Sequence, residues 1–220
     1  MGVKGKSRKL KYLSEGVDDF QPGSRKRVLR NKLGLVRIRQ IEDAELAAYH
    51  KAEETLIRKY EASHRFRIDD IDEMHRLFLG GIYDWAGHHR EVNISKGDFP
   101  FASAMAVGPA LKDFEQNVLF VYTPCTPGDP KKVAQAIATV HVELLLIHPY
   151  REGNGRTARL LANLMAYQAG LPGLDFSFIG SKGKSFNQYV KAIQAGLDRN
   201  YGAMEEIILK AIKFALKRVE

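Results

Sequence analysis

Two predicted helices meet at a short polar segment, and this junction limits the possible fold more than any other part of the chain. Residues 131–147 place their apolar side chains at helical spacing, which predicts a helix with one buried face. Residues 160–167 continue a second apolar pattern that stops before Gly170 and Pro172. The segment between them, His148–Arg159, is therefore predicted to be a tight loop that runs directly into the N-terminus of a helix.

This segment reads His-Pro-Tyr-Arg-Glu-Gly-Asn-Gly-Arg-Thr-Ala-Arg, and its second half has the features of an anion-binding site. The first turn of a helix offers unpaired backbone N–H groups and the positive end of the helix dipole. Gly153 and Gly155 allow the backbone to approach a ligand closely, and Asn154 tolerates turn geometry and can cap the helix. Arg156 and Arg159 lie three positions apart, so both guanidinium groups project from one helical face and suit phosphate oxygens.

The first half supplies the remaining parts of a phosphate-transfer site. Glu152 is a hard oxygen ligand of the kind that Mg²⁺ binds together with substrate phosphates. His148 follows the first helix, and a neutral imidazole there can accept a proton near neutral pH. A structural alternative fits each residue alone, because glycines reverse a chain, Asn caps a helix and arginines are often solvated. The complete set in this order favours phosphate transfer.

The segment resembles the signature of the Fic family, His-Pro-Phe-x-Asp/Glu-Gly-Asn-Gly-Arg-x-x-Arg. Tyr150 in place of the usual Phe is its one departure, and this change keeps an aromatic ring for core packing. The resemblance extends from about Lys32 to about Lys217. It implies an all-α Fic fold, a bundle of about six to eight helices with a small β-hairpin flap next to the active-site loop. Apolar patterns at 42–60, 69–85 and 103–120 predict three further helices, and residues 183–196 and 201–219 predict two more.

The resemblance also implies an activity. Fic enzymes typically transfer AMP from ATP to a Ser, Thr or Tyr hydroxyl of a target protein and release pyrophosphate. By similarity, His148 is the base that deprotonates the target hydroxyl, and Glu152 holds Mg²⁺ on the α- and β-phosphates. In-line attack at phosphorus needs a positioned hydroxyl, a base within reach and cations on the leaving group, which agrees with these roles.

Further residues are assigned to the nucleotide by the same resemblance. The backbone around Asn154 forms the anion hole and its side chain adds a donor, Arg156 contacts the leaving phosphates, and Arg159 contacts the γ-phosphate. Two residues of the predicted helix 183–196 occupy a stretch where Fic proteins place contacts to the adenosine. The nucleotide-binding residues expected in this way are Gly153, Asn154, Gly155, Arg156, Arg159, Asn187 and Tyr189.

A second segment predicts a β-hairpin. Residues 91–101 alternate apolar and polar side chains on either side of Gly97-Asp98, and they follow an Ala-Gly-x-x-Arg stretch that ends at Arg90. In Fic proteins such a stretch and hairpin form the flap that aligns the target by main-chain pairing. The target-docking flap is expected at Ile94, Ser95, Lys96 and Gly97.

The positive charge of the chain is concentrated at its start. Residues 1–32 contain ten Lys or Arg against three Asp or Glu, a net +7 of the total +8. We expect two parts, a basic N-terminal arm at 1–31, partly packed on the core, and a Fic domain at 32–220. Such an arm is either a solvated tail or a contact for nucleic acid or an acidic partner.

The chain shows no targeting or membrane signal. Its longest purely apolar run, Val118–Tyr122, is far too short to cross a bilayer, and no apolar stretch follows the basic N-terminal residues. The single Cys125 excludes a disulfide within the chain and fits a reducing compartment. We expect a bacterial cytoplasmic protein without a membrane partner, which is potentially translocated into a host cell.

Many Fic proteins are inhibited by a helix with the motif Ser/Thr-x-x-x-Glu-Gly/Asn, whose glutamate pairs with the second motif arginine. Only Glu15 and Glu152 are followed by Gly here, and Lys11 and His148 stand four residues before them. The resemblance then implies a toxin-like enzyme whose separate small antitoxin supplies the inhibitory glutamate to Arg159. A degenerate inhibitory helix, a constitutively active enzyme and an effector role remain open.

Other activities are alternatives to AMP transfer. Fic relatives also include kinases, phosphocholine transferases and enzymes that remove AMP; the kinase-type motif has lysine at the second glycine, so Gly155 favours AMP transfer. Gly183-Lys184-Ser185 is no P-loop, because the required earlier glycine falls at Phe178. A catalytically inert basic binding module is the remaining alternative outside enzymology.

Overall fold

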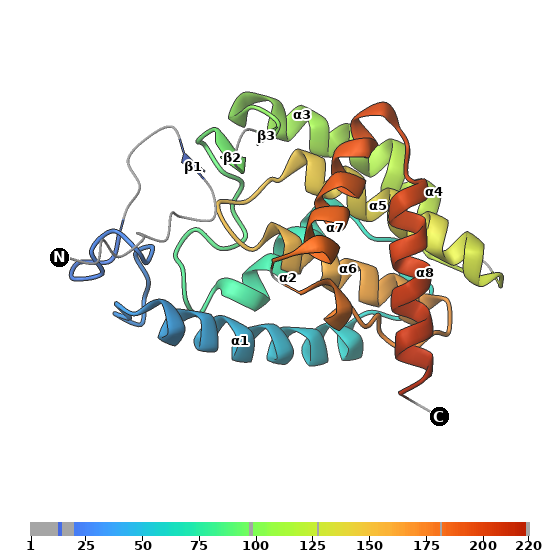
Figure 1. Cartoon of the computed structure of the whole chain (residues 1–220), viewed down its shortest axis with the longest axis horizontal. Helices are drawn as coiled ribbons and strands as arrows, with labels where there is room; N and C mark the ends of the chain where they lie inside the picture. Colours follow the sequence, from blue (N-terminus) through green and yellow to red (C-terminus); the bar gives the residue numbers. More distant parts are fainter. Residues whose placement is uncertain (1–12, 15–19, 97–98, 127, 181, 219–220) are drawn as a thin grey trace.

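The computed structural model describes residues 13–14, 20–96, 99–126, 128–180 and 182–218. Helices dominate this part of the chain, and Figure 1 shows α1 running along one side of a bundle that contains α2, α5, α6 and α8. The α-helices are α1 (Ile38–Lys59), α2 (Ile68–Leu79), α3 (Ala104–Phe114), α4 (Phe120–Tyr122), α5 (Pro130–Ile147), α6 (Asn154–Gln168), α7 (Lys184–Ala195) and α8 (Gly202–Leu216). The predicted all-α class with six to eight helices is confirmed.

The sequence around α5 explains why this helix has sharp ends. Asp129 accepts a hydrogen bond from the backbone N–H of Lys131 (2.9 Å), and Pro130 occupies the first turn, where no backbone donor is needed. The helix ends at His148, whose backbone is left-handed (φ 54°, ψ 60°). This conformation turns the chain away from the helix axis immediately, so the functional loop begins without a spacer.

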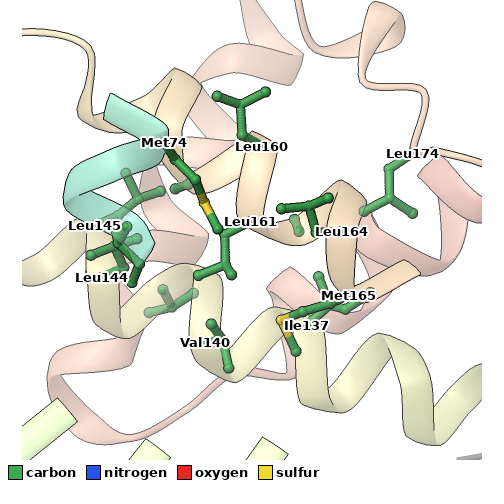
Figure 2. Packing of buried hydrophobic residues seen from close by; sticks show 14 of the residues in the cluster. Met74, Ile137, Val140, Leu144, Leu145, Leu160, Leu161, Leu164, Met165 and Leu174 are labelled. Atoms are coloured by element: carbon green, nitrogen blue, oxygen red, sulfur yellow. The ribbon is translucent and has the colours of Figure 1, made fainter. Parts of the chain in front are cut away.

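Packing between α5, α6 and α2 forms the centre of the hydrophobic core. Figure 2 shows the leucines of α5 and α6 interleaved, with Met74 of α2 pointing into the same layer. Leu161, Met165 and Ile137 are each at most 1% exposed. Helix α8 packs on α5 from outside, so α5 is covered by several elements. The two helices that flank the functional loop are therefore fixed by the best-packed part of the molecule.

A small antiparallel sheet lies beside the α5–α6 connection (Figure 1). Its strands are β1 (Leu13–Ser14), β2 (Ile94–Lys96) and β3 (Phe99–Pro100), in the order β1-β2-β3. Ser95 pairs with Pro100 and Lys96 with Phe99, which is the register of a hairpin and confirms that prediction. The turn itself, including Gly97, lies outside the described residues.

Two predicted helices differ from the observed ones. The helix predicted at 69–85 ends at Leu79, because two consecutive glycines at 80 and 81 follow and disfavour a further helical turn. The helix predicted at 103–120 is divided into α3, a π-helical turn at Glu115–Leu119 and the short α4. A π turn holds one more residue than an α turn, so it changes which side chains face the core.

The segment before α1 makes defined contacts with the bundle. Val28 is 3% exposed and belongs to the core, and the backbone N–H of Lys32 donates to the carbonyl of Ile82 (2.8 Å). The boundary drawn at residue 31 between arm and domain remains a prediction. Within the described ranges, no helix has the length and apolar character needed to cross a membrane.

Met74→Ala should destabilise the fold by about 2–5 kcal/mol, because it leaves a cavity between three packed helices. Met74 is fully buried. The matched control is Met105→Ala on α3, since Met105 is 93% exposed and its loss should change stability by less than about 0.5 kcal/mol. Urea unfolding followed by circular dichroism measures both. Equal stabilities of the two variants would contradict the described packing.

Candidate active site

The active-site loop, residues 148–153, reverses the chain between α5 and α6 with unusual backbone angles at both ends. Gly153 has φ 86°, and a Cβ atom at this position would lie 2.7 Å from Cδ1 of Leu79 and 3.2 Å from Nε2 of His75. Only glycine satisfies both the left-handed angle and the close approach of α2. The first glycine of the Gly-Asn-Gly turn is thus required by packing as well as by any ligand.

Arg90 connects this loop to the flap. Its Nε donates to the carbonyl of His148 (2.8 Å), its Nη2 to that of Ile147 (3.3 Å), and its backbone N–H to that of Pro149 (2.8 Å). The same guanidinium donates to the carbonyls of Val92 (2.8 Å) and Ala102, which lie just before β2 and just after β3. Arg90 is 5% exposed, and burial lowers its pKa, but an arginine stays charged. One cation therefore binds the C-terminal carbonyls of α5 and both ends of the hairpin.

The side chain of His148 is oriented by its own helix and by the flap. Nδ1 lies 3.0 Å from the carbonyl oxygen of Leu145, and since a carbonyl can only accept, Nδ1 carries the proton. In the neutral ring Nε2 is then the basic nitrogen. The ring of Phe101, directly after β3, stacks on the imidazole with centroids 3.7 Å apart and planes 18° apart. His148 and the residue that follows the hairpin are consequently in direct contact.

A buried polar network supports the loop from the side of α2. His75 accepts a hydrogen bond from the backbone N–H of Gly87 at Nδ1 (2.8 Å) and donates from Nε2 to the carbonyl of Glu152 (2.9 Å). The ring of Tyr150 stacks on His75 at 3.8 Å, and its hydroxyl donates to Asp72 (2.6 Å). Burial lowers the pKa of His75 to about 4, so this ring is neutral near pH 7 and keeps both hydrogen bonds.

The side chain of Asn154 forms hydrogen bonds within the loop, whereas its backbone belongs to the first turn of α6. Its Oδ1 accepts from the backbone N–H of Tyr150 (2.8 Å) and its Nδ2 donates to the carbonyl of the same residue (2.7 Å). The side chain is 2% exposed. The N–H groups of Asn154 and Gly155 lie in the first turn of α6, where a helix has no acceptor of its own. The anion-binding character of this turn therefore comes from the backbone.

Two carboxylates lie near Arg156, one from distant α1 and one from four residues earlier in the chain. Nη1 of Arg156 lies 2.7 Å from Oε2 of Glu45 on α1, and Nη2 lies 3.7 Å from Oε1 of Glu152. Glu45 also accepts from the hydroxyl of Tyr83 (2.6 Å), and Glu152 accepts from the N–H of Gly153 (2.9 Å). Burial would lower the pKa of Arg156, but these carboxylates raise it. Arg156 is thus held in place by acidic side chains.

Arg159 has a different environment, one turn further along α6. Its guanidinium carbon lies 5.2 Å from the ring centroid of Phe176 and 5.7 Å from that of Tyr189. Its Nε–H is buried and has no hydrogen-bond partner among the described residues. A buried donor without a partner is costly, and an anionic oxygen would satisfy it. Arg159 is therefore suited to bind an anion at this end of the site.

The site residues predicted from the signature lie together. Those predicted from other segments differ in their burial. Tyr189 is 5% exposed and packs beneath Arg159, but Asn187 is exposed on α7. Ile94, at the start of the flap, is 3% exposed, and Lys96 lies with its Nζ 4.6 Å from the ring centroid of Phe186 on α7. The flap and α7 therefore meet on the same side of the loop.

Three supporting residues were not predicted as site residues from the sequence. Glu45, Asp72 and His75 lie on α1 and α2, and nothing in their local pattern distinguishes them from surface positions of an amphipathic helix. Arg90 had a local signal, the Ala-Gly-x-x-Arg stretch, but its contacts with the loop depend on tertiary structure.

Tyr150→Phe restores the residue that the family signature usually has, and it should lower the unfolding free energy by about 1.5–3 kcal/mol. The substitution keeps the ring but removes the hydroxyl that donates to the Asp72 carboxylate. Thermal or urea unfolding measures the loss. Tyr122→Phe, at a half-buried tyrosine of α4 outside this network, is the control. A Tyr150→Phe variant as stable as the parent would show that the hydroxyl adds nothing.

Comparisons with known proteins agree with the geometry. Residues 65–166 match the Fic/DOC family. The probable protein adenylyltransferase Fic of Escherichia coli (strain K12) is 30% identical over 211 residues, which cover 93% of this chain and 92% of that protein. The protein adenylyltransferase Fic of Nematostella vectensis is 36% identical over 121 residues, but these cover only 54% of this chain and 26% of that longer protein.

A solved structure shows the same fold. The BepC protein of Bartonella tribocorum, crystallised with bound AMPPNP, superposes with a TM-score of 0.66 at 22% identity and covers 83% of this chain and 91% of its own. The helical bundle with a small antiparallel sheet is the fold that the sequence resemblance predicted. With near full-length similarity to the Escherichia coli relative, the chain belongs to the Fic/DOC family.

Proposed function

We propose that this chain is a protein adenylyltransferase, which transfers AMP from Mg-ATP to a Ser, Thr or Tyr hydroxyl of a target protein and releases pyrophosphate. One observation carries this proposal above the others. The proton on Nδ1 of His148 is directed to the Leu145 carbonyl, which makes Nε2 the basic nitrogen of a buried imidazole in the loop that leads into the N-terminal end of α6. The curated relatives are named as protein adenylyltransferases, and the same activity is the simplest use of this arrangement.

The nucleotide phosphates bind at the first turn of α6 in this proposal. The backbone N–H groups of Asn154 and Gly155 and the helix dipole stabilise negative charge on the α-phosphate. Arg159, with its buried Nε–H, receives the terminal phosphate. Gly155 supports AMP transfer over phosphoryl transfer, because the kinase-type signature has lysine at this position. The preorganised donors cost no reorganisation when charge develops on the phosphate oxygens.

The chemical step moves one proton and exchanges one bond at phosphorus. The target hydroxyl oxygen attacks the α-phosphorus while its proton passes to Nε2 of His148. The bond between the α-phosphorus and the oxygen that bridges to the β-phosphate breaks, and that oxygen leaves as part of pyrophosphate. Stacking of Phe101 on the imidazole holds the base at a fixed place relative to the flap. The imidazolium then returns its proton to solvent.

A magnesium ion fits the donors available at this site. Among the described residues no cluster of three or more metal-binding side chains exists, so the protein alone would not chelate a metal. Mg²⁺ at phosphates commonly takes only one or two carboxylates, its other ligands being phosphate oxygens and water. Glu152, 14% exposed at the head of α6, would hold the ion, and the ion would neutralise charge on the leaving pyrophosphate.

Arg156 and Glu45 act together in this proposal. The ion pair between them orients the guanidinium beside Glu152, so that its remaining donors face the leaving phosphates. An arginine positioned by a buried carboxylate loses less side-chain entropy when phosphate arrives than a solvated arginine does. Glu45 therefore belongs to the proposed site although it lies on α1.

The flap is the proposed docking place for the acceptor segment of the target. An extended peptide pairs with a free strand edge through backbone hydrogen bonds. The outer edge of β2 already pairs with β1, where Leu13 aligns with Ser95 and Ser14 with Ile94. The acceptor segment would replace β1 in this two-residue pairing. In that position it would lie beside the residues that lead to Phe101 and His148.

We also propose that a separate inhibitory protein binds this chain, as in a toxin–antitoxin pair. The side chain of Arg159 packs against aromatic rings, and its Nε–H would be satisfied by a carboxylate as well as by a phosphate. A glutamate supplied by a partner would therefore compete with the terminal phosphate of ATP for the same donor. Calorimetry with Mg-ATP in the presence of a candidate partner tests this competition directly.

His148→Ala should reduce AMP incorporation by at least about 100-fold, because it removes the base from the chemical step. The affinity for Mg-ATP should change less than about three-fold, since the imidazole makes no contact with phosphate in the proposal. Incorporation of label from α-labelled ATP and calorimetric titration measure the two effects. His50→Ala, at an exposed histidine of α1, is the control. Unchanged incorporation in His148→Ala would refute the assigned base.

A further inference from the structure

Two hydrogen-bonded polar side chains, His141 and Tyr189, lie next to Arg159 of α6 and take no part themselves in the proposed chemical step. His141 lies in the middle of α5 and is 1% exposed, and Tyr189 lies on α7 and is 5% exposed. Nε2 of His141 is 2.7 Å from the hydroxyl of Tyr189, and Nδ1 is 3.2 Å from the carbonyl of Ala158. Arg159 directly follows Ala158 in the sequence.

The direction of each hydrogen bond in this group is fixed by elementary chemistry. The Ala158 carbonyl can only accept, so Nδ1 of His141 donates to it. Burial, and next the charge of Arg159, lower the pKa of His141 to about 3, so the ring is neutral and Nε2 is an acceptor. The hydroxyl proton of Tyr189 is therefore donated to His141. The lone pairs of the tyrosine oxygen remain for a donor, and an arginine can only donate.

Arg159 lies against this oriented tyrosine and is enclosed by a second ring. Its guanidinium carbon is 5.7 Å from the ring centroid of Tyr189 and 5.2 Å from that of Phe176. The ring of Phe176 in turn stacks on His141 with centroids 6.1 Å apart and planes 14° apart. Burial raises the pKa of Tyr189, while the charge of Arg159 and its polar contact with the phenol oppose that rise. Both rings next to the arginine are themselves held by contacts with His141.

We infer that Tyr189, oriented by His141, is a positioning residue that aims Arg159 at the terminal phosphate of the nucleotide. This inference rests on the proposed function and assigns Tyr189 a role other than the adenosine contact expected from the family resemblance. Within the described part of the chain, Tyr189 is buried, and its two polar neighbours, His141 and Arg159, are sufficient to explain how its hydroxyl is oriented. A rigidly held guanidinium distinguishes a nucleoside triphosphate from a diphosphate, because only the triphosphate reaches it.

Calorimetric titration of the whole chain with Mg-ATP and with Mg-ADP separates the two roles of Tyr189. These nucleotides share the adenosine and the first two phosphates, so the ratio of their affinities reports the terminal phosphate alone. Tyr189→Phe should weaken Mg-ATP binding by about 3- to 10-fold and change Mg-ADP binding by less than about two-fold. Tyr201→Phe, which removes another tyrosine hydroxyl bonded to α5 through Glu143, should leave the ratio unchanged.

The same substitution in an Arg159→Ala background tests whether Tyr189 acts through the arginine. Tyr189→Phe should then have no further effect on the ATP-to-ADP ratio, since the group that it positions is gone. If Tyr189→Phe does not fold, as judged by circular dichroism, Phe176→Leu removes the other face of the enclosure at a half-buried position and should lower the same ratio.

Three outcomes overturn the inference. Equal weakening of both nucleotides by Tyr189→Phe would make Tyr189 an adenosine contact. An unchanged ratio in folded Tyr189→Phe or Phe176→Leu would show that Arg159 needs no positioning. A further loss in the Arg159→Ala background would show that Tyr189 acts independently. Failure of the parent chain to bind Mg-ATP at all would instead contradict the proposed function, so the two failures are distinguishable.

Discussion

The hydrogen bonds from Arg90 to the carbonyl end of α5 determine where the active-site loop begins, and the remainder of the site is arranged around that point. A helix ends with unpaired carbonyls and partial negative charge, and here that end is buried. Arg90 satisfies the carbonyls of Ile147 and His148 with a permanent cation and also binds both ends of the hairpin. His148 at the end of α5 and the hairpin beside it therefore have a fixed separation. His75 holds the other end of the loop in place, because its Nε2 donates to the carbonyl of Glu152.

The two arginines of the signature have opposite electrostatic surroundings, and this asymmetry suits an unsymmetrical substrate. Arg156 is paired with Glu45 and lies near Glu152, so its charge is largely balanced before a ligand arrives. Arg159 is enclosed by aromatic rings, which leave its charge uncompensated by carboxylates in this part of the described structure. In the proposed reaction, the paired Arg156 would orient the leaving phosphates, whereas Arg159, with only aromatic neighbours, would attract the most negative end of the nucleotide.

The sequence predicted the helix–loop–helix at 131–167, the hairpin and the family, because each of these depends on local patterns. Helical periodicity, capping residues such as Asp129 and a twelve-residue signature are readable without tertiary structure. The environment of the signature was not predictable in this way. Glu45, Asp72 and His75 reach the loop from helices that lie more than 70 positions away in sequence, and only packing brings them there. The hydroxyl of Tyr150 is a further example. The signature alone presented Tyr in place of Phe as a neutral change, whereas in the structure this hydroxyl donates to Asp72.

Transfer of the AMP portion of ATP by the proposed site can be detected by intact-mass spectrometry of the purified chain after incubation with Mg-ATP. The chain itself is the acceptor offered in this experiment, so no separate target protein is needed. AMP transfer predicts a product that is heavier by one AMP, absent when ATP is replaced by an analogue whose bond between the α- and β-phosphates cannot be cleaved. A product heavier by a single phosphate would contradict AMP transfer, because it would mean that the nucleotide binds in the reverse direction and that Gly155 does not determine the outcome.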